Sequence, residues 1–109
     1  MPKLCNIDLE RSQEIFTELN NFISKLRKQY RIKKIYLFGS FAKGEIHEGS
    51  DIDLIIVGDF EGKMFTRIAE VLKLTDLPLE PLIYTRDEFK RLKRTSTLIK
   101  NVLKTARPL

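Results

Sequence analysis

Two aspartates, Asp51 and Asp53, stand at the head of an apolar run that continues to Val57. Alternate residues of a β-strand face the same side of the sheet, and a rise of about 3.3 Å per residue places these two Cα atoms roughly 7 Å apart. Like charges held this close repel each other unless a cation lies between them. Carboxylate oxygens suit a hard divalent cation such as magnesium. The pattern therefore predicts a metal site at the start of a strand.

A second chemical element, Gly39-Ser40, follows the apolar run 35–38 and opens a short polar segment. Exposed backbone amides and a hydroxyl at the start of a helical turn can hold a phosphate group. Each element has an ordinary structural explanation, because Gly-Ser turns are common and an edge strand can carry two solvated acids. Together they place a phosphate cradle and metal ligands on adjacent strand ends, which is a more specific pattern.

A third acid, Glu80, is alone in the apolar run 77–84. If this run forms a strand beside the aspartate strand, Glu80 reaches the same site; otherwise it is an edge carboxylate that faces water. Three converging carboxylates with a bound triphosphate are typical of phosphoryl or nucleotidyl transfer. Two metal ions about 3.5–4 Å apart would stabilise the attacking and leaving oxygens, and the third acid would help to deprotonate the attacking hydroxyl.

The elements that must position these residues can be predicted from apolar periodicity and turn residues. The pattern favours an α/β (α+β) fold with a small mixed sheet flanked by helices. Asp8 is expected to cap the first helix, Thr85 the third, and Thr95 or Ser96 the last. The first two strands are expected to pair antiparallel. Pro81 indicates that the third strand lies at an edge of the sheet or that the proline stands at the start of the strand. The predicted helices are 9–30, 63–74, 86–92 and 96–105, and the predicted strands are 34–38, 51–57 and 79–84.

The composition indicates one soluble domain spanning residues 1–109, because the chain has 109 residues, 42% of them hydrophobic and 32% charged. A single cysteine, no apolar run near the roughly 18 residues of a membrane span, and no signal-peptide core favour the cytoplasm. The net charge of +5 is uneven, since residues 86–109 hold eight basic and two acidic residues. This segment is either a solvated helix face or a surface for an acidic or polyanionic partner.

The spacing of Gly39-Ser40, ten intervening residues and Asp51-Ile52-Asp53 resembles the signature of the DNA polymerase beta-like nucleotidyltransferase superfamily. The short length is similar to that of its minimal branch, the antitoxin of the HEPN/MNT toxin-antitoxin pair. The resemblance covers residues 33–84 and implies a magnesium-dependent enzyme, with two metal ions, that uses ATP or another NTP.

The resemblance assigns a role to each matched residue. Gly39 and Ser40, with Lys43, would bind the nucleotide phosphates, while Asp51 and Asp53 would be catalytic metal ligands with Glu80 as the third carboxylate. Two departures are a lysine at position 43, where relatives commonly have arginine and its bidentate fork, and a glutamate at position 80 in place of the commoner aspartate. Minimal members act as antitoxins, several by transferring AMP to a tyrosine of the partner HEPN ribonuclease, with which a complex is expected.

Two other readings remain open. The chain could silence its partner by occlusion alone, or it could transfer nucleotides to a nucleic acid or a small molecule through its basic C-terminal segment. Nucleic acid is not expected as a direct partner, because 109 residues leave no room for the additional domains that usually grip a polynucleotide. His47, in the loop before the aspartates, is expected to be a surface residue.

Overall fold

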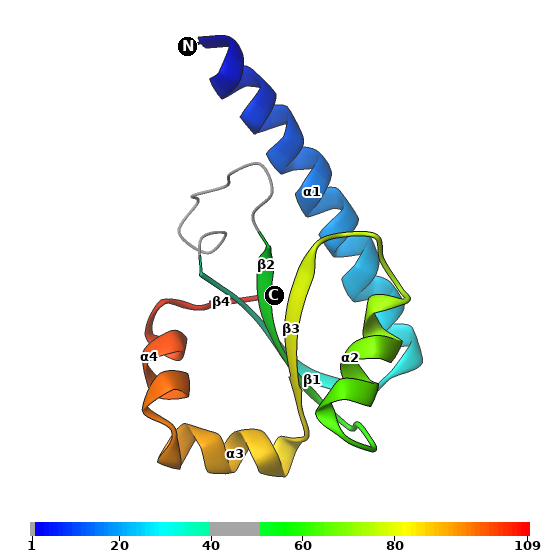
Figure 1. Cartoon of the computed structure of the whole chain (residues 1–109), viewed down its shortest axis with the longest axis vertical. Coiled ribbons are helices and arrows are strands. Elements are labelled where there is room, and N and C mark those ends of the chain that lie inside the picture. The colour runs from blue at the N-terminus through cyan, green and yellow to red at the C-terminus, as the bar shows by residue number, and fades with distance from the viewer. Residues whose placement is uncertain (1, 40–50) are drawn as a thin grey trace.

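The computed structural model describes the backbone of residues 2–39 and 51–109, and the side chains of residues 13–39 and 51–109. Eight elements follow one another in this part of the chain (Figure 1). No helix among them is long and apolar enough to cross a membrane. The elements are α1 (Pro2–Gln29), β1 (Ile32–Phe38), β2 (Ile52–Gly58), α2 (Met64–Leu72), β3 (Leu79–Tyr84), α3 (Arg86–Thr95), α4 (Thr97–Thr105) and β4 (Arg107–Pro108).

The four strands form one mixed sheet in the order β3-β2-β1-β4. The pairing of β1 with β2 is antiparallel, as predicted from the short connection between them. The pairing of β2 with β3 is parallel, and α2 provides the crossover that parallel neighbours require. The predicted mixed sheet is confirmed, and the third strand lies at an edge, as the proline in it indicated.

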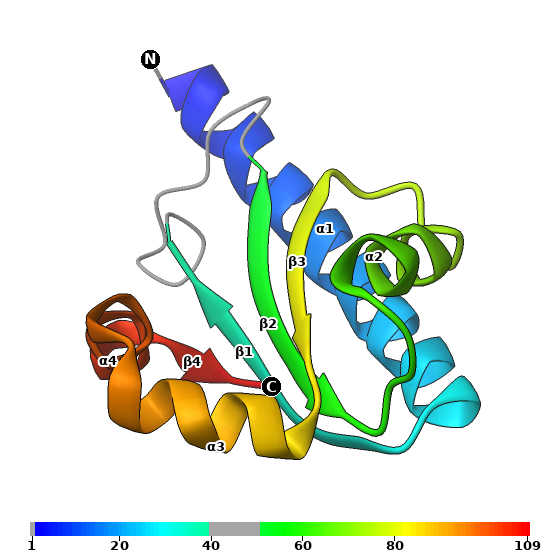
Figure 2. The same cartoon turned by 60° about the horizontal axis from the view of Figure 1, so that its bottom comes forward.

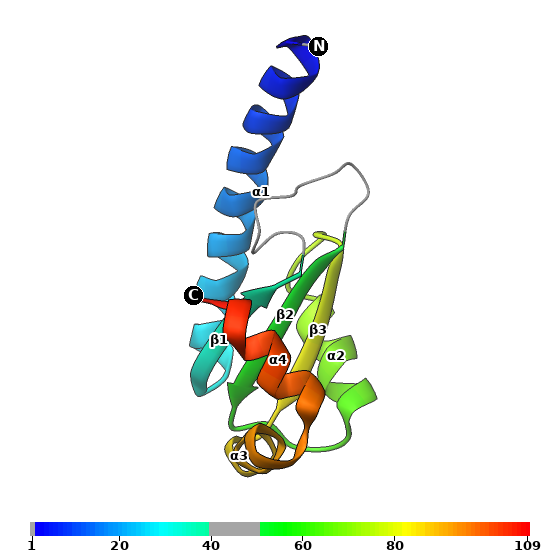
Figure 3. The same cartoon turned by 90° about the vertical axis from the view of Figure 1, so that its left-hand side faces the viewer.

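The largest differences from the sequence predictions are the start of α1, the end of α3 and an additional strand, whereas the bounds of α2, β1 and β2 differ by one or two residues. The first helix begins at Pro2 rather than near residue 9, so Asp8 lies inside α1 and is not its N-cap. Proline fits the first turn of a helix because its fixed φ is already helical, and α1 extends well past the end of the sheet (Figures 1 and 3). The helix α3 continues to Thr95. The strand β4 was not predicted, since two residues carry no periodicity.

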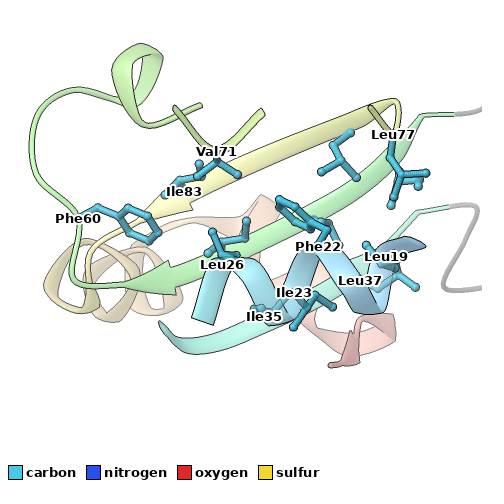
Figure 4. Close-up of a cluster of buried hydrophobic side chains, with 14 residues drawn as sticks. Leu19, Phe22, Ile23, Leu26, Ile35, Leu37, Phe60, Val71, Leu77 and Ile83 are labelled. Atoms are coloured by element: carbon cyan, nitrogen blue, oxygen red, sulfur yellow. The ribbon is translucent and has the colours of Figure 1, made fainter. Parts of the chain in front are cut away.

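One face of the sheet packs against α1 and α2 (Figure 2). The side chains that α1 contributes recur at helical spacing, and Leu19, Phe22 and Leu26 are almost completely buried. They meet alternate strand residues such as Ile35 and Leu37 (Figure 4). Burying a leucine or phenylalanine side chain stabilises the fold by about 1.5–3 kcal/mol. This layer fixes the positions of β1, β2 and β3.

The opposite face is only partly covered, by α3 and α4. Phe89 of α3 and Ile99 of α4 pack on Ile55 and Val57 of β2. Both helices begin with the caps that the sequence predicted, because the Thr85 and Ser96 side chains accept from backbone amides three residues on. The functional side chains lie on this second face, where β2 and β3 begin.

The outer edge of β3 is closed to further strand pairing. Alternate residues of an edge strand direct their amides away from the sheet, and here these are Leu79, Pro81 and Ile83. The Leu79 amide bonds to the Leu77 carbonyl at 2.8 Å, and Pro81 has no amide hydrogen to donate. The Ile83 amide points to the Met64 sulfur at 3.3 Å.

Arg67 of α2 completes this closure. Among the described residues it is the charged side chain that is buried, with 7% of its surface exposed. Its guanidinium donates to the carbonyl oxygens of Ile83 at 3.1 Å and Glu61 at 3.3 Å. It also donates to Glu88 Oε1 at 2.7 Å, and the same Glu88 oxygen accepts from the Thr85 amide in the capping box of α3. One side chain thus ties α2, β3 and α3 together.

Candidate functional site

Three carboxylates meet where β2 and β3 begin. Asp51 directly precedes β2, Asp53 is the second residue of β2, and Glu80 is the second residue of β3. The parallel register makes Asp53 and Glu80 direct partners, and neighbouring strands lie about 4.8 Å apart. Of the two arrangements that the sequence left open, the structure has the third strand beside the second, with Glu80 next to Asp53.

The carboxylates interact strongly with one another. The pKa of Glu80 is raised above its ordinary value, first by hydrogen bonding to Asp51 and then by the negative charges of Asp51 and Asp53. The pKa of half-buried Asp53 is also raised, mainly because burial penalises its charge, with a further contribution from Asp51. A hydrogen bond from Glu80 acts in the opposite direction on Asp53. A bound cation would oppose both shifts, because it would stabilise the charged carboxylates.

The cluster has the donor chemistry that a magnesium site needs, namely closely spaced carboxylate oxygens that repel one another. Among the side chains of residues 13–39 and 51–109, no three of His, Cys, Asp or Glu are arranged to hold a metal ion. The residue types at this point of the sheet nevertheless fit magnesium.

Gly39 brings the end of β1 against this cluster. Phe38 is the partner of Asp53 in the antiparallel register, and Gly39 follows it with a φ of +73°. A Cβ atom at this position would overlap Asp53 Oδ2. Glycine is thus required by both the backbone conformation and the close approach of the carboxylate. Ser40, Lys43 and His47, the other predicted residues of this turn and loop, lie outside the described residues.

Replacing Gly39 with alanine is expected to damage the site beyond its effect on stability. Gly62 provides a matched control, because its φ is +74° but its nearest neighbour is the Thr66 Cβ at 3.9 Å. Both substitutions should cost about 1–2 kcal/mol of stability from the left-handed backbone. Only Gly39→Ala should also displace the Asp53 carboxylate and abolish transfer, as thermal unfolding and an activity assay of both variants would show. Equal activity of the two variants would contradict this role.

An apolar cavity of about 390 Å³ opens beside the carboxylates. Asp53 and Glu80 form its polar wall. Its other lining residues are Phe38, Ile68, Leu72, Leu79, Pro81 and Leu82. Sequence reasoning missed this cavity, because each of these residues fits the ordinary apolar pattern of a strand or helix. The cavity arises only when the strands are aligned, because Phe38 and Leu82 lie at the margin of the cluster with α3 and α4 and are only partly buried.

Comparisons with known proteins agree with this geometry. The family model described as a nucleotidyltransferase domain matches residues 19–108. The protein adenylyltransferase MntA of Thermococcus cleftensis is 34% identical over 76 residues, which cover 68% of this chain and 70% of that protein. A Methanocaldococcus jannaschii chain, provisionally described as a protein adenylyltransferase, is 51% identical over 45 residues, or 39% of this chain. The alignment spans only 45% of that relative's length.

Two solved structures share the fold. A provisionally described nucleotidyltransferase from Sulfolobus solfataricus gives a TM-score of 0.63 at 21% identity and covers 77% of this chain and 78% of that one. A structure described as a toxin-antitoxin with AMP-PNP gives a TM-score of 0.55 at 21% identity, covering 81% of this chain and 69% of that one. With the family match over residues 19–108, these results show that the chain belongs to the nucleotidyltransferase domain family and has the fold of its minimal members.

Proposed function

We propose that this protein is a magnesium-dependent nucleotidyltransferase that moves AMP, or another NMP, from an NTP to a hydroxyl group. The observation that carries the proposal is the register that makes Asp53 and Glu80 direct partners beside the Gly39 turn. The adenylyltransferase name of the Thermococcus cleftensis relative supports AMP as the transferred group. Use of ATP agrees with a cytoplasmic protein.

Each residue has a role in this reaction. Asp51, Asp53 and Glu80 would hold magnesium, which supplies charge neutralisation of the phosphates and of the leaving pyrophosphate. The Gly39-Ser40 turn and Lys43 would bind the phosphate groups. The acceptor oxygen forms a bond to the α-phosphorus while the bond from that phosphorus to pyrophosphate breaks. Glu80, which lies exposed at the cavity wall, would receive the hydroxyl proton.

The cavity beside Glu80 favours a protein acceptor over a sugar hydroxyl. Six of its eight lining residues are apolar, and its volume of about 390 Å³ exceeds the space that a tyrosine ring needs. Aromatic side chains with a polar tip suit a pocket that is apolar at one end and charged at the other. We therefore propose that a tyrosine is modified, on a partner of the HEPN ribonuclease class. The solved neighbour described as a toxin-antitoxin with AMP-PNP supports a partner of this kind.

The direct test incubates the purified protein with its partner and with ATP, CTP, GTP or UTP labelled at the α-phosphate. The expected result is magnesium-dependent labelling of the partner, release of pyrophosphate, and a mass increase of one nucleotide on a single tyrosine. Replacing that tyrosine with phenylalanine should abolish the labelling. Absence of labelled partner with all four nucleotides would refute the proposal.

A second candidate function is silencing by occlusion, in which the protein acts as an antitoxin simply by binding its partner. The observation in its favour is the solved neighbour described as a toxin-antitoxin with AMP-PNP, since an antitoxin can act by binding its partner. The two functions differ in whether neutralisation of the partner needs the aspartates, which the Asp53→Asn variant decides.

A further inference from the structure

A second hollow, of about 280 Å³, lies between the start of β1 and the helix α3. It is at the end of the sheet opposite to the carboxylates, because β1 begins there and ends beside Asp53 (Figure 1). Its cationic lining residues are Lys33, Lys34, Arg86, Lys90 and Lys93, and its other lining residues are Tyr36, Val57, Asp87 and Phe89. The fold thus adds two lysines of β1 to the basic C-terminal segment.

The lysines of this hollow, which we call the lysine hollow, form no ion pair with an acidic residue of 13–39 and 51–109. Among the ion pairs of the described residues, only Arg86 of this group is engaged, at 3.3 Å from Asp59. Lys93 lies over the Phe89 ring, with its Nζ atom 5.4 Å from the ring centre, and Asp87 is the single acid in the lining. All four lysine side chains are exposed. The positive charges gathered around the hollow repel one another, and a bound polyanion would reduce this repulsion.

We propose that the lysine hollow binds the phosphate backbone of a single-stranded nucleic acid. Lysine is a compact point charge that binds phosphate oxygens, and four lysines line the hollow beside one arginine that is already paired with Asp59. The hollow is confined between one strand and one helix, a space that suits the backbone of one strand better than the broad face of a duplex. The exposed Arg94 of α3 extends the positive surface beyond the hollow.

This proposal reverses an expectation from the sequence. The length of 109 residues argued against nucleic acid as a direct partner, because it leaves little room for the domains that usually grip a polynucleotide. The structure shows instead that the basic side chains of α3 are exposed on the surface, while Phe89 of the same helix is buried. A separate site on the nucleotidyltransferase domain itself removes the need for a further domain.

The test measures the fluorescence anisotropy of a 5′-fluorescein single-stranded RNA, at salt concentrations between about 50 and 200 mM. We expect saturable binding that weakens steeply with salt. The double variant K90Q/K93Q should bind about tenfold more weakly or worse, and its salt slope should fall by about 1.4, since each phosphate contact contributes about 0.7 for single strands. Glutamine is a good helix former, so α3 should remain folded.

The matched control is K100Q/K104Q, which removes the same charge from α4 outside the hollow and should change affinity by no more than about twofold. Asp53→Asn should bind the RNA as the unmodified protein does, which separates this site from the proposed transferase centre. Absence of saturable binding, equal losses in the two lysine variants, or loss of binding in Asp53→Asn would overturn the proposal. Tighter, K90Q/K93Q-sensitive binding of an oligoglutamate peptide would also overturn it, in favour of an acidic protein partner.

Discussion

Replacing Asp53 with asparagine is expected to reduce nucleotidyl transfer at least a thousandfold while leaving the protein folded. Asp53 is the central member of the cluster, since it pairs with Glu80 across β2 and β3 and lies against Gly39. Asparagine keeps the shape but removes a charge that would hold magnesium. A thousandfold loss corresponds to about 4 kcal/mol of transition-state stabilisation, a reasonable cost for a weakened metal site. Labelling of the partner at saturating ATP would measure it.

The stability of the same variant separates a functional role from a structural one. Burial and the charge of Asp51 raise the pKa of Asp53, so the charged form is disfavoured in the folded state. Its neutral replacement should therefore unfold, without magnesium, at the same temperature as the unmodified protein or a higher one. Asp76→Asn, at an exposed acid in the loop before β3, serves as the control and should change neither activity nor stability.

This experiment also decides between transfer and occlusion. If Asp53→Asn no longer labels the partner but still neutralises it, silencing is by binding alone. If neutralisation is lost together with labelling, catalysis is required. A variant that keeps full transfer would exclude Asp53 from the catalytic set.

Replacing Arg67 with methionine should lower the free energy of unfolding by about 3 kcal/mol, more than any of the other substitutions described. The substitution removes hydrogen bonds to two carbonyl oxygens and to the Glu88 carboxylate. Hydrogen bonds that involve charged groups contribute about 1.5–3 kcal/mol, and neutral ones about 1. Water can solvate the Glu88 carboxylate after the substitution, because its side chain is 45% exposed. The loss of stability is therefore expected at the low end of the range for removing one partner of a buried ion pair. The unfolding temperature should fall by about 13 °C.

The companion variant Glu88→Gln tests the charge separately and should cost about 1 kcal/mol at neutral pH. Hydrogen bonding from Arg67 and then from Thr85 lowers the pKa of Glu88 in the folded state. Its contribution is therefore complete above the unfolded-state value of about 4.3 and is lost as the pH falls through the folded value. The two proteins should converge in stability in acid.

Arg91→Met, at an exposed position of α3, controls for the loss of an arginine and should change stability by less than about 0.5 kcal/mol. Urea unfolding at several pH values would measure all three variants. A penalty for Glu88→Gln that stays constant down to acid pH would contradict the role of the Glu88 charge.

Most of the fold could be predicted from the sequence, because its elements have strong local signals. Alternation and apolar runs located the three longer strands, and Thr85 and Ser96 were recognisable as caps. The start of α1 was missed because Asp8 is a good cap in general but lies here within a longer helix. The strand β4 was missed because its pairing with Tyr36 and Leu37 is long-range and leaves no local pattern.

The candidate site was predicted in its residue types but not in its shape. The spacing of Asp51 and Asp53 and the isolation of Glu80 indicated a carboxylate cluster, and the parallel register brings them together. The Gly39 contact with Asp53 and the apolar cavity arise only when strands from different parts of the chain are aligned. Sequence spacing describes one strand at a time and therefore does not reveal them.

The closed outer edge of β3 has a consequence for how an acceptor is recognised. An extended peptide cannot dock along this edge, because Pro81 donates nothing and the polar groups of Ile83 are occupied by Met64 and Arg67. An acceptor segment must instead enter end-on, with its side chain first and its own backbone largely free. Selectivity would then depend little on the amino acids that flank the modified residue. Selectivity would be set by the fit of that one side chain and by contacts elsewhere between this protein and the partner that carries the acceptor.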